Sequence, residues 1–355
     1  MSRKLKVLHC PLNNGNNAWV LSRAERKLGL ASDLVIFKKH PFFEDYDRYL
    51  KIESITIPNE IKRIAFLKEA LRNYDIFHFN FGQSIWDHPF WGLNHLDFPI
   101  IKKYKKKIIV TFQGDDARRK DYFLNKYGFG PYDKQDYTLL DKFFDRMRAI
   151  RIGQVEKYAD KIFALNPDIM SILPKRTEFL PYSSIDVDEV KPIYPTRTSR
   201  KIKIIHAPSE RIKKGTEIIV SIIKKLSLKY PLEWVLVENL PRKRAWEIYQ
   251  KADIAIDQII IGWYGAFAVE MMALGKPVIA YLRSSDIQAF VPFYKDIPIV
   301  NADPQTLEES LIMLIENYHL RNKIAKQSRK FVQKYHHPLK IAQKTKKIYE
   351  DLCAG

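Results

Sequence analysis

Long apolar runs and cysteines are both scarce in this sequence of 355 residues. The longest apolar candidate, Gln258 to Val269, falls well short of the roughly 20 residues that a membrane-spanning helix needs. The two cysteines, Cys10 and Cys353, stand at opposite ends of the chain and do not make a disulfide framework. The first residues lead straight into a predicted strand, and no signal peptide is visible. The sequence therefore predicts a protein of the reducing cytoplasm.

Several sequence signatures are missing as well. The dinucleotide pattern G-x-G-x-x-G does not follow the first predicted strand, which argues against an NAD enzyme. Low-complexity segments are absent, and the only internal repetition is a rough doubling of α/β halves. A chain of this length is too long for one typical core and predicts two domains.

Positive charge dominates the composition. The chain carries 60 Lys and Arg against 41 Asp and Glu, a formal net charge of +19. This balance favours anionic partners such as nucleic acid, phosphate-bearing substrates or an anionic membrane face. A solvated basic surface explains the charge equally well. No recognised nucleic-acid-binding module accompanies the charge, so we expect no nucleic-acid partner.

Predicted strands and helices alternate along the chain. Lys4–Cys10 and Asp33–Phe37 are predicted strands that enclose a polar turn and an amphipathic helix, an opening typical of a doubly wound sheet. Ligands of such sheets bind at the carboxyl ends of the strands. The segment Asp186–Arg200 is polar, contains prolines and has no apolar period, which predicts a linker between domains.

A strand, loop, helix and strand are predicted over Ala252–Tyr281, and their helix carries a single charged residue, Glu270. A buried carboxylate is costly unless hydrogen-bond donors meet it, and the vicinal hydroxyls of a sugar supply two donors. The helix begins after glycines, and the free N–H groups at its start suit a phosphate. The unit therefore predicts a nucleotide-sugar pocket. An ordinary buried unit with Glu270 at its rim is the alternative.

A basic loop precedes a predicted helix earlier in the second half. It follows the predicted strand Lys201–Ile205 and carries Arg211 and Lys214. Helix N–H groups together with these two cations would clamp a diphosphate. A basic loop with Thr216 as the helix N-cap is the alternative.

These two segments resemble the donor-binding segments of family 4 glycosyltransferases, the group 1 glycosyltransferases of the GT-B fold. Glu270, in GAFAVEMMALGKPVIA, matches the glutamate that holds the donor ribose. The family's partner glutamate lies eight residues earlier, where this chain has Gly262. A subgroup carries a D-Q…G-W-Y-G segment instead, which Asp257, Gln258, Trp263 and Tyr264 fit. The basic loop RIKKG is similar to the family's R-x-x-K-G donor loop. The donor-side residues that the resemblance implies are Arg211, Lys214, Gly215, Gly262, Trp263, Tyr264, Gly265 and Glu270.

A looser resemblance covers parts of the first half. The turn PLNNGNN resembles the acceptor-side loop that GT-B enzymes place after their first strand. The segment QGDDAR resembles an H-G-S-D-x-R loop, with glutamine in place of the histidine and aspartate in place of the serine. This match makes Asp116 the candidate catalytic residue. The acceptor-side residues that it implies are Gly15, Asn16, Gln113 and Arg118.

The resemblance implies an α/β protein of the GT-B fold, with two doubly wound Rossmann-like domains facing across a cleft. We expect an acceptor-side domain over 1–188, a donor-binding domain over 189–335 and a helix over 336–355 that crosses back to the first domain. The implied activity is retaining transfer of a sugar from a nucleotide-diphosphate sugar, in cell-surface polysaccharide or glycolipid biosynthesis. The alternatives are a GT-B nucleotide-sugar epimerase and a basic nucleic-acid-binding protein.

No metal and no organic cofactor are expected. The pair Asp115 and Asp116 can be compared with the metal-binding D-x-D motif of the other glycosyltransferase fold. No histidine or further carboxylate at metal-ligand spacing accompanies the pair. The resemblance likewise implies a metal-independent enzyme.

The run KKYKKK stands just before a predicted strand at Ile108–Thr111. With Trp86, Phe90 and Trp91 upstream, it predicts a patch that meets anionic lipid, and a solvated face is the alternative. The acceptor is accordingly expected to be lipid-linked, a glycan or another small molecule, and the enzyme cytoplasmic or peripheral at the inner face of the membrane. The lysines of the run are Lys102, Lys103, Lys105, Lys106 and Lys107.

Overall fold

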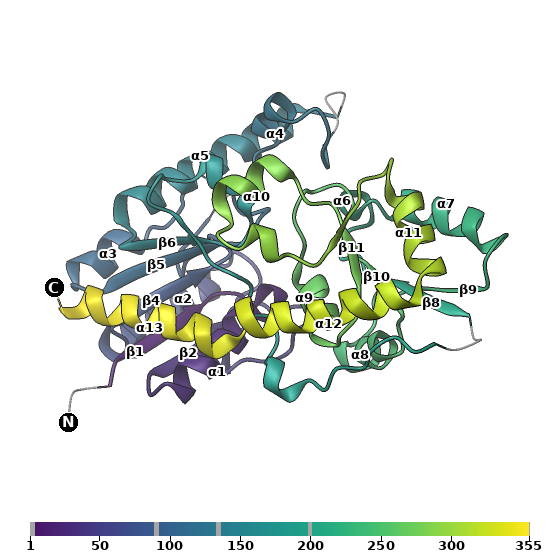
Figure 1. The fold of residues 1–355 in the computed structure, drawn as a ribbon. Helices are drawn as coiled ribbons and strands as arrows, with labels where there is room; N and C mark the ends of the chain where they lie inside the picture. Colours follow the sequence, from purple (N-terminus) through teal and green to yellow (C-terminus); the bar gives the residue numbers. More distant parts are fainter. Residues whose placement is uncertain (1–3, 89–91, 133–135, 198–200, 355) are drawn as a thin grey trace. The chain divides into compact units, whose positions relative to one another are not determined.

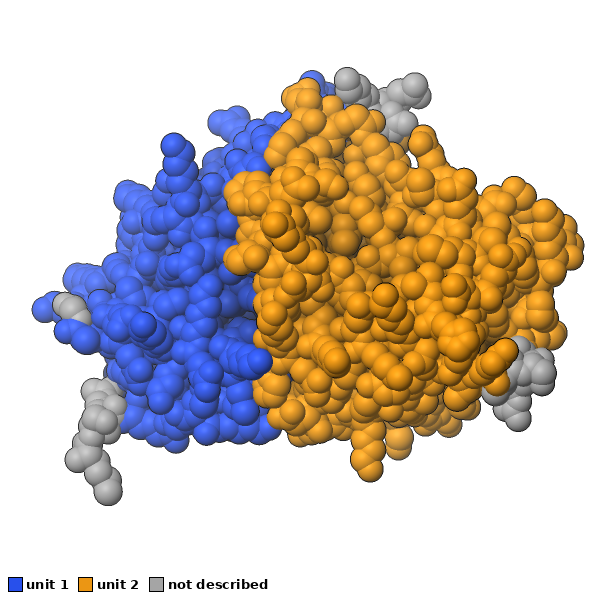
Figure 2. Space-filling view, in the orientation of Figure 1, with its two compact units in different colours: residues 1–123, 137–185, 338–355 blue, residues 124–136, 186–337 orange. Residues whose placement is uncertain are grey.

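The computed structural model describes residues 4–88, 92–132, 136–197 and 201–354 and divides the chain into two compact units (Figure 1). Unit 1 comprises Met1–Phe123, Tyr137–Ile185 and Pro338–Gly355. Unit 2 comprises Leu124–Asp136 and Asp186–His337 (Figure 2). Neither unit is a single stretch of sequence.

Unit 1 is built on a seven-stranded parallel sheet of order β3-β2-β1-β4-β5-β6-β7. The pairing of Val7 with Ile76 and of Ile76 with Lys107 places the carboxyl ends of the central strands along one edge. The strands are β1 (Lys6–Cys10), β2 (Ala31–Ile36), β3 (Arg48–Tyr49), β4 (Ile76–Asn80), β5 (Lys107–Phe112), β6 (Lys161–Ala164) and β7 (Glu178–Phe179).

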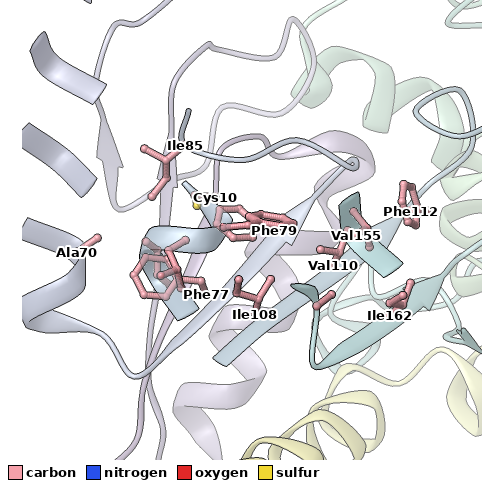
Figure 3. Close-up of a cluster of buried hydrophobic side chains, with 14 of the residues drawn as sticks. Cys10, Ala70, Phe77, Phe79, Ile85, Ile108, Val110, Phe112, Val155 and Ile162 are labelled. Atoms are coloured by element: carbon pink, nitrogen blue, oxygen red, sulfur yellow. The ribbon is translucent and has the colours of Figure 1, made fainter. Parts of the chain in front are cut away.

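Helices cover both faces of this sheet. The main core of unit 1 joins alternate residues of β4 and β5 to helices α2, α3 and α5 (Figure 3). Phe77, Phe79, Ile108 and Val110 in that core are fully buried, as expected for central strands of a parallel sheet. The helices of the unit are α1 (Asn17–Lys27), α2 (Ile57–Asn73), α3 (Phe98–Lys103), α5 (Leu139–Tyr158) and α13 (Pro338–Ala354), and α4 (Lys120–Lys126) runs from unit 1 into unit 2.

The last helix, α13, packs against α1 and is joined to unit 1 by buried hydrogen bonds. The Thr345 hydroxyl donates to Glu25 at 2.9 Å, and the Tyr349 hydroxyl lies 2.6 Å from His78 Nδ1. His9 Nε2 lies 2.9 Å from the other oxygen of Glu25. All five side chains are completely buried, so the end of the chain is part of the interior of the unit that its beginning forms.

Unit 2 contains a smaller parallel sheet of order β12-β11-β10-β8-β9. Its strands are β8 (Ile202–His206), β9 (Leu232–Leu236), β10 (Ile254–Ile256), β11 (Val278–Ala280) and β12 (Val300–Asn301). Its helices are α6 (Arg211–Lys214), α7 (Thr216–Ser227), α8 (Arg242–Gln250), α9 (Ala266–Ala273), α10 (Ser284–Phe290), α11 (Leu307–Glu316) and α12 (Tyr318–Tyr335). Isoleucines and leucines from the sheet, α7 and α11 form its core.

The α/β class is confirmed, while several predicted element boundaries are wrong. The sequence predicts a helix over Ile61–Arg72, whereas α2 begins at Ile57, because Thr56 caps it and Pro58 fits its first turn. The segment 119–137 is rich in Gly, Tyr and Asp and has no clear periodicity, which predicts a loop, but it contains α4. The expected linker 186–200 contains the short 3₁₀ helix Val187–Glu189, and its last three residues lie outside the described part of the chain.

Within the described residues, none of the helices combines the length and the apolar character needed to cross a membrane.

Buried His95 predicts a pH dependence of stability. Its Nε2 lies 3.0 Å from the Gly82 carbonyl oxygen, and burial lowers the pKa of its imidazole to about 3. The folded state therefore keeps His95 neutral, whereas the unfolded state takes up a proton below about pH 6.5. The stabilisation by His95 is fully present above that pH and is lost as the pH falls towards 3.

This dependence is best measured against His95→Asn, because asparagine tolerates the positive φ of 54° at this position. Urea unfolding of both proteins should show the advantage of the wild type shrinking by about 2 kcal/mol between pH 7 and pH 5. The difference between two proteins removes the contributions of other titrating groups. An advantage that does not change with pH would contradict a neutral buried His95.

Candidate active site

Two loops of unit 2 leave the carboxyl ends of the adjacent strands β8 and β10. These strands pair in parallel, with Ile204 opposite Ile254, so their following loops are neighbours. The first loop leads through α6 and Gly215 into α7. The second runs from Asp257 to Gly265 and leads into α9. The structure thus places the two predicted donor-side loops beside each other.

Asp257 ties the two loops together. One carboxylate oxygen accepts a hydrogen bond from Lys214 Nζ at 2.9 Å, and the other accepts from the Gly265 backbone N–H at 2.6 Å. Asp257 is only 1% exposed, so its charge is compensated by these partners and not by bulk water. The interaction holds a cation and the N-terminus of α9 beside each other.

Glycine is required where the loops approach each other. Gly215 has a φ of +76°, and a Cβ on it would lie 2.6 Å from a side-chain carbon of Ile259. Gly262 has a φ of +89°, and a Cβ there would lie 2.9 Å from Arg283. A side chain at either position meets both left-handed backbone strain and a steric clash.

His206 orients the start of α7. Its Nδ1 lies 2.8 Å from the Ile256 carbonyl oxygen, and its Nε2 lies 2.9 Å from the Thr216 hydroxyl. Burial lowers the pKa of the imidazole to about 4, so the ring is neutral. Because a carbonyl oxygen can only accept, Nδ1 donates to Ile256 and Nε2 accepts from Thr216.

The predicted ligand-binding charges all have protein partners in this structure. Arg211 donates to Glu217 at 2.6 and 2.9 Å and to Glu238 at 2.7 Å. Glu270 is 6% exposed and lies 2.9 Å from Arg242 Nη2, at the start of α8. Burial raises the pKa of the Glu270 carboxyl, and Arg242 acts in the opposite direction.

Trp263 and Tyr264 belong to the second loop, and their side chains lie in the interior of unit 2. Both side chains are completely buried, and the Tyr264 hydroxyl lies 2.9 Å from His336 Nε2. The Gln258 amide donates to the Trp263 carbonyl oxygen. Gly265 and Ala266, at the start of α9, are the partly exposed residues of this stretch. A donor molecule would therefore meet the backbone of the loop and not these two rings.

Unit 1 presents a second set of predicted residues after β5. Asp116 is buried, and its carboxylate accepts hydrogen bonds from the Gln113 N–H at 3.0 Å and the Gly114 N–H at 2.7 Å. Burial raises the pKa of this carboxyl to about 6, although both N–H groups act to lower it. Asp116 thus shapes the loop that carries the other acceptor-side candidates.

Arg118 lies in the same loop and is 3% exposed. Its Nε donates to Asp168 at 2.8 Å, and its Nη1 donates to Asp115. Asp168 is completely buried in the 3₁₀ helix after β6. Two carboxylates therefore compensate this buried guanidinium, and one of them, Asp115, belongs to the pair that was compared with a metal motif.

The turn after β1 lies against the segment after β7. Gly15 and Asn16 both adopt left-handed backbone conformations, with φ of 58° and 59°. The Asn16 amide donates to the Ser184 carbonyl oxygen at 3.4 Å. The buried hydroxyls of Ser183 and Ser184 have no hydrogen-bond partner among the described residues, and neither has Gln113 Nε2.

Sequence reasoning missed Arg242 and Arg283, as well as the two serines. Arg283 lies three residues after the carboxyl end of β11, and Ser183 and Ser184 lie four and five residues after the end of β7. Their positions at the carboxyl ends of predicted strands were the available signal. Arg242 had no such signal, because its contact with Glu270 joins helices that are separated along the chain by β10.

One group of side chains in the described ranges has the spacing of a metal site: His9, Glu25 and His78 in unit 1. Their ligand atoms already serve the network that holds α13. Glu25 accepts from Ser32 at 2.7 Å and from Thr345, and His78 Nε2 lies 2.7 Å from the Thr111 hydroxyl. This group fits a structural hydrogen-bond network better than a metal centre.

Two α/β units, each built on a parallel sheet with loops at the carboxyl ends of its strands, are typical of the GT-B glycosyltransferase fold. Similar solved structures confirm the prediction of that fold. Residues 219–331 match the family model "Glycosyl transferases group 1". The resemblance to group 1 glycosyltransferases is thereby confirmed over that segment, which contains Gly262, Gly265 and Glu270. None of the curated proteins compared matches the sequence.

Solved structures are similar over nearly the whole chain. Sucrose-phosphate synthase from Thermosynechococcus elongatus is 16% identical, with a TM-score of 0.67 over 99% of this chain and 100% of that one. Anabaena HepE in complex with UDP-glucose is 9% identical, with a TM-score of 0.64 over 98% and 100%. A putative UDP-N-acetylglucosamine 2-epimerase from Listeria monocytogenes is 14% identical, with a TM-score of 0.51 over 96% and 94%. At these identities the likeness establishes the fold alone.

The close approach at Gly215 predicts a large effect of Gly215→Ala. The variant adds backbone strain and a contact with Ile259, whereas Gly29→Ala adds strain alone, because nothing lies within 4 Å of a Cβ at Gly29. We expect Gly29→Ala to lower the unfolding free energy by about 1 kcal/mol and Gly215→Ala by about 2 to 4 kcal/mol. Urea unfolding measures both. Equal losses would mean that the loop moves aside.

Proposed function

We propose that this protein is a retaining glycosyltransferase that moves a sugar from a nucleotide-diphosphate sugar to an acceptor. The observation that carries the proposal is Glu270, a buried carboxylate on an otherwise apolar helix, in the segment that matches the group 1 glycosyltransferase model. It lies in one unit with the loops that Asp257 ties together. The HepE complexes with UDP and UDP-glucose support a nucleotide-sugar donor for this fold.

Each donor-side group has a distinct proposed role. The Glu270 carboxylate accepts hydrogen bonds from the ribose hydroxyls. Lys214, Arg211 and the backbone N–H groups of Gly262, Trp263 and Tyr264 meet the negative charge that develops on the departing diphosphate, whereas the Gly265 N–H already donates to Asp257. This type of stabilisation contributes most in many active sites. Because these cations neutralise the diphosphate, we propose that no metal ion is needed.

On the acceptor side, Asp116 is our candidate proton acceptor. Burial brings the pKa of its carboxyl to about 6, which is near the working range of a general base. Gln113 and Arg118 share its loop, and Gly15 and Asn16 lie after β1 in the same unit. We propose that these groups receive an acceptor in cell-surface polysaccharide or glycolipid biosynthesis.

The function is tested with UDP-, GDP- and ADP-sugars, first by thermal shift and then by release of the sugar. A nucleotide sugar that binds the folded protein raises its melting temperature, and the rise grows with ligand concentration above the Kd. Release or transfer of the sugar should continue in EDTA. If the main product were an epimerised sugar, the alternative of a nucleotide-sugar epimerase would be favoured. If none of the donors stabilised the protein, the proposal would be contradicted.

Glu270→Gln provides the sharpest test of the donor site. The variant retains the shape of the side chain but loses the charge that the ribose hydroxyls meet. Nucleotide binding should weaken by roughly 1.5–3 kcal/mol, the scale of a hydrogen bond to a charged group, as measured by isothermal calorimetry. Glu233→Gln, on the half-exposed strand β9, is the matched control and should bind as the wild type does. Unchanged affinity of Glu270→Gln would remove Glu270 from the site.

We also propose that the lysine run over 102–107 contacts an anionic membrane surface. Lys103 and Lys105 are exposed, whereas Lys102 lies 2.7 Å from Asp160 and Lys106 lies 3.9 Å from Asp75. The proposed aromatic neighbour Trp86 is partly buried and donates to Glu60, and Phe90 and Trp91 lie outside the described residues. Lys103 and Lys105 are therefore the most exposed of the five lysines.

Flotation with liposomes tests this surface. Each exposed lysine near an anionic membrane is worth about 1 kcal/mol, so changing Lys103 and Lys105 to glutamine should abolish most of the binding to anionic vesicles. The matched control changes Lys102 and Lys106, which already have carboxylate partners, and should float nearly as well as the wild type. If the wild type does not float, the acceptor is not presented by a membrane through this run.

A further inference from the structure

The chain segment that begins at Leu124, within α4, belongs to unit 2, although the residues on both sides of it belong to unit 1. Residues 124–136 form this excursion, and the structure describes them through Tyr132 and again at Asp136. The described part lies against the residues that follow β11 and against the start of α10. No sequence pattern singled out this contact.

Tyr127 is the centre of the contact. Its hydroxyl donates to both carboxylate oxygens of Asp286, each at 2.9 Å. The guanidinium carbon of Arg283 lies 3.8 Å from the centre of the Tyr127 ring, within the range of a cation–π interaction. Asp286 is 2% exposed and Arg283 is 7% exposed, so both contacts are made away from bulk water.

A second residue of the segment adds to the hold on Arg283. The Phe129 carbonyl oxygen accepts from Arg283 Nη2 at 3.3 Å, and the Phe129 ring packs edge-on against Tyr281. Lys126 Nζ lies 3.5 Å from Asp286. The segment thus contacts Arg283 and Asp286 through side chains, a ring face and a backbone carbonyl.

Arg283 in turn supports the predicted donor loop. Its backbone N–H donates to the Gly262 carbonyl oxygen at 2.9 Å, and its Nη1 donates to the Ile261 carbonyl oxygen at 3.3 Å. A Cβ on Gly262 would lie 2.9 Å from the guanidinium carbon of Arg283. The guanidinium therefore contacts the Tyr127 ring and the backbone of the loop that ends at Gly265.

We propose that Tyr127 and Arg283 are positioning residues, and that the 124–132 segment holds the Gly262–Gly265 loop in its donor-binding conformation through them. The proposal rests on the proposed donor site, whose phosphate-binding amides lie in that loop. Along the chain, α4 joins this segment to the Gln113–Arg118 loop.

The variants Tyr127→Leu and Tyr127→Phe separate this role from simple packing. Leucine fills space but offers no ring face to Arg283, whereas phenylalanine retains the ring and loses only the hydroxyl. The full-length protein is titrated with UDP, or with GDP or ADP if one of those binds the wild type, by isothermal calorimetry. We expect Tyr127→Leu to weaken binding about tenfold and Tyr127→Phe to restore most of that affinity.

Phe129→Leu is the matched control, because it removes the neighbouring ring while the carbonyl that binds Arg283 remains. It should bind the nucleotide as the wild type does. The proposal is overturned if Tyr127→Leu binds with unchanged affinity, or if Phe129→Leu weakens binding equally, since the second result would show a general packing effect.

Hydrogen exchange gives a readout that needs no ligand. Backbone amides of residues 259–265 should exchange faster in Tyr127→Leu than in the wild type and recover in Tyr127→Phe. Failure of every nucleoside diphosphate to bind the wild type would contradict the proposed function and leave this arm to decide the inference. Unchanged exchange of the loop in Tyr127→Leu would overturn the inference even if nucleotide binding were intact in the wild type.

Discussion

The candidate donor site depends on the hydrogen bonds that the buried carboxylate of Asp257 accepts. It receives Lys214 from one loop and the Gly265 N–H from the other, and it is almost completely excluded from water. A buried carboxylate without such partners would be costly, so the loops must meet it for the fold to be stable. The same contacts place a cation beside the N-terminus of α9, so this arrangement follows from the requirement to compensate one buried charge.

The candidate binding charges are all paired, yet the pairs differ in how easily a ligand could replace the partner. Arg211 and its carboxylates are substantially exposed, and exposed ion pairs are worth about 0–1 kcal/mol, so Arg211 can turn towards a phosphate at low cost. Arg118 and Asp168 are buried, and breaking such a pair costs about 3–5 kcal/mol. Arg118 is therefore better suited to shaping its loop than to moving towards a substrate.

The sequence predicted those site residues that are recognisable from a short stretch of the chain. Glu270 was recognisable because it is the lone charge on an apolar helix, and Gly215 because it matches the last position of the R-x-x-K-G loop. The pairing of Glu270 with Arg242 and the stacking of Arg283 on Tyr127 were not recognisable. Those contacts join residues that are distant along the chain, and composition and periodicity carry no information about them.

The buried hydrogen bonds of α13 show why domain boundaries in the sequence are not folding boundaries here. Thr345 and Tyr349 complete the interior around Glu25 and His78, near the beginning of the chain. A fragment that ends at Ile185 would leave those buried polar groups without their partners, each at a cost of about 1–3 kcal/mol. A fragment that begins at Asp186 would likewise lack Tyr127, the partner of buried Asp286. Each unit therefore needs a chain segment from beyond the boundary between Ile185 and Asp186. We expect the two units to fold well only as parts of one continuous chain.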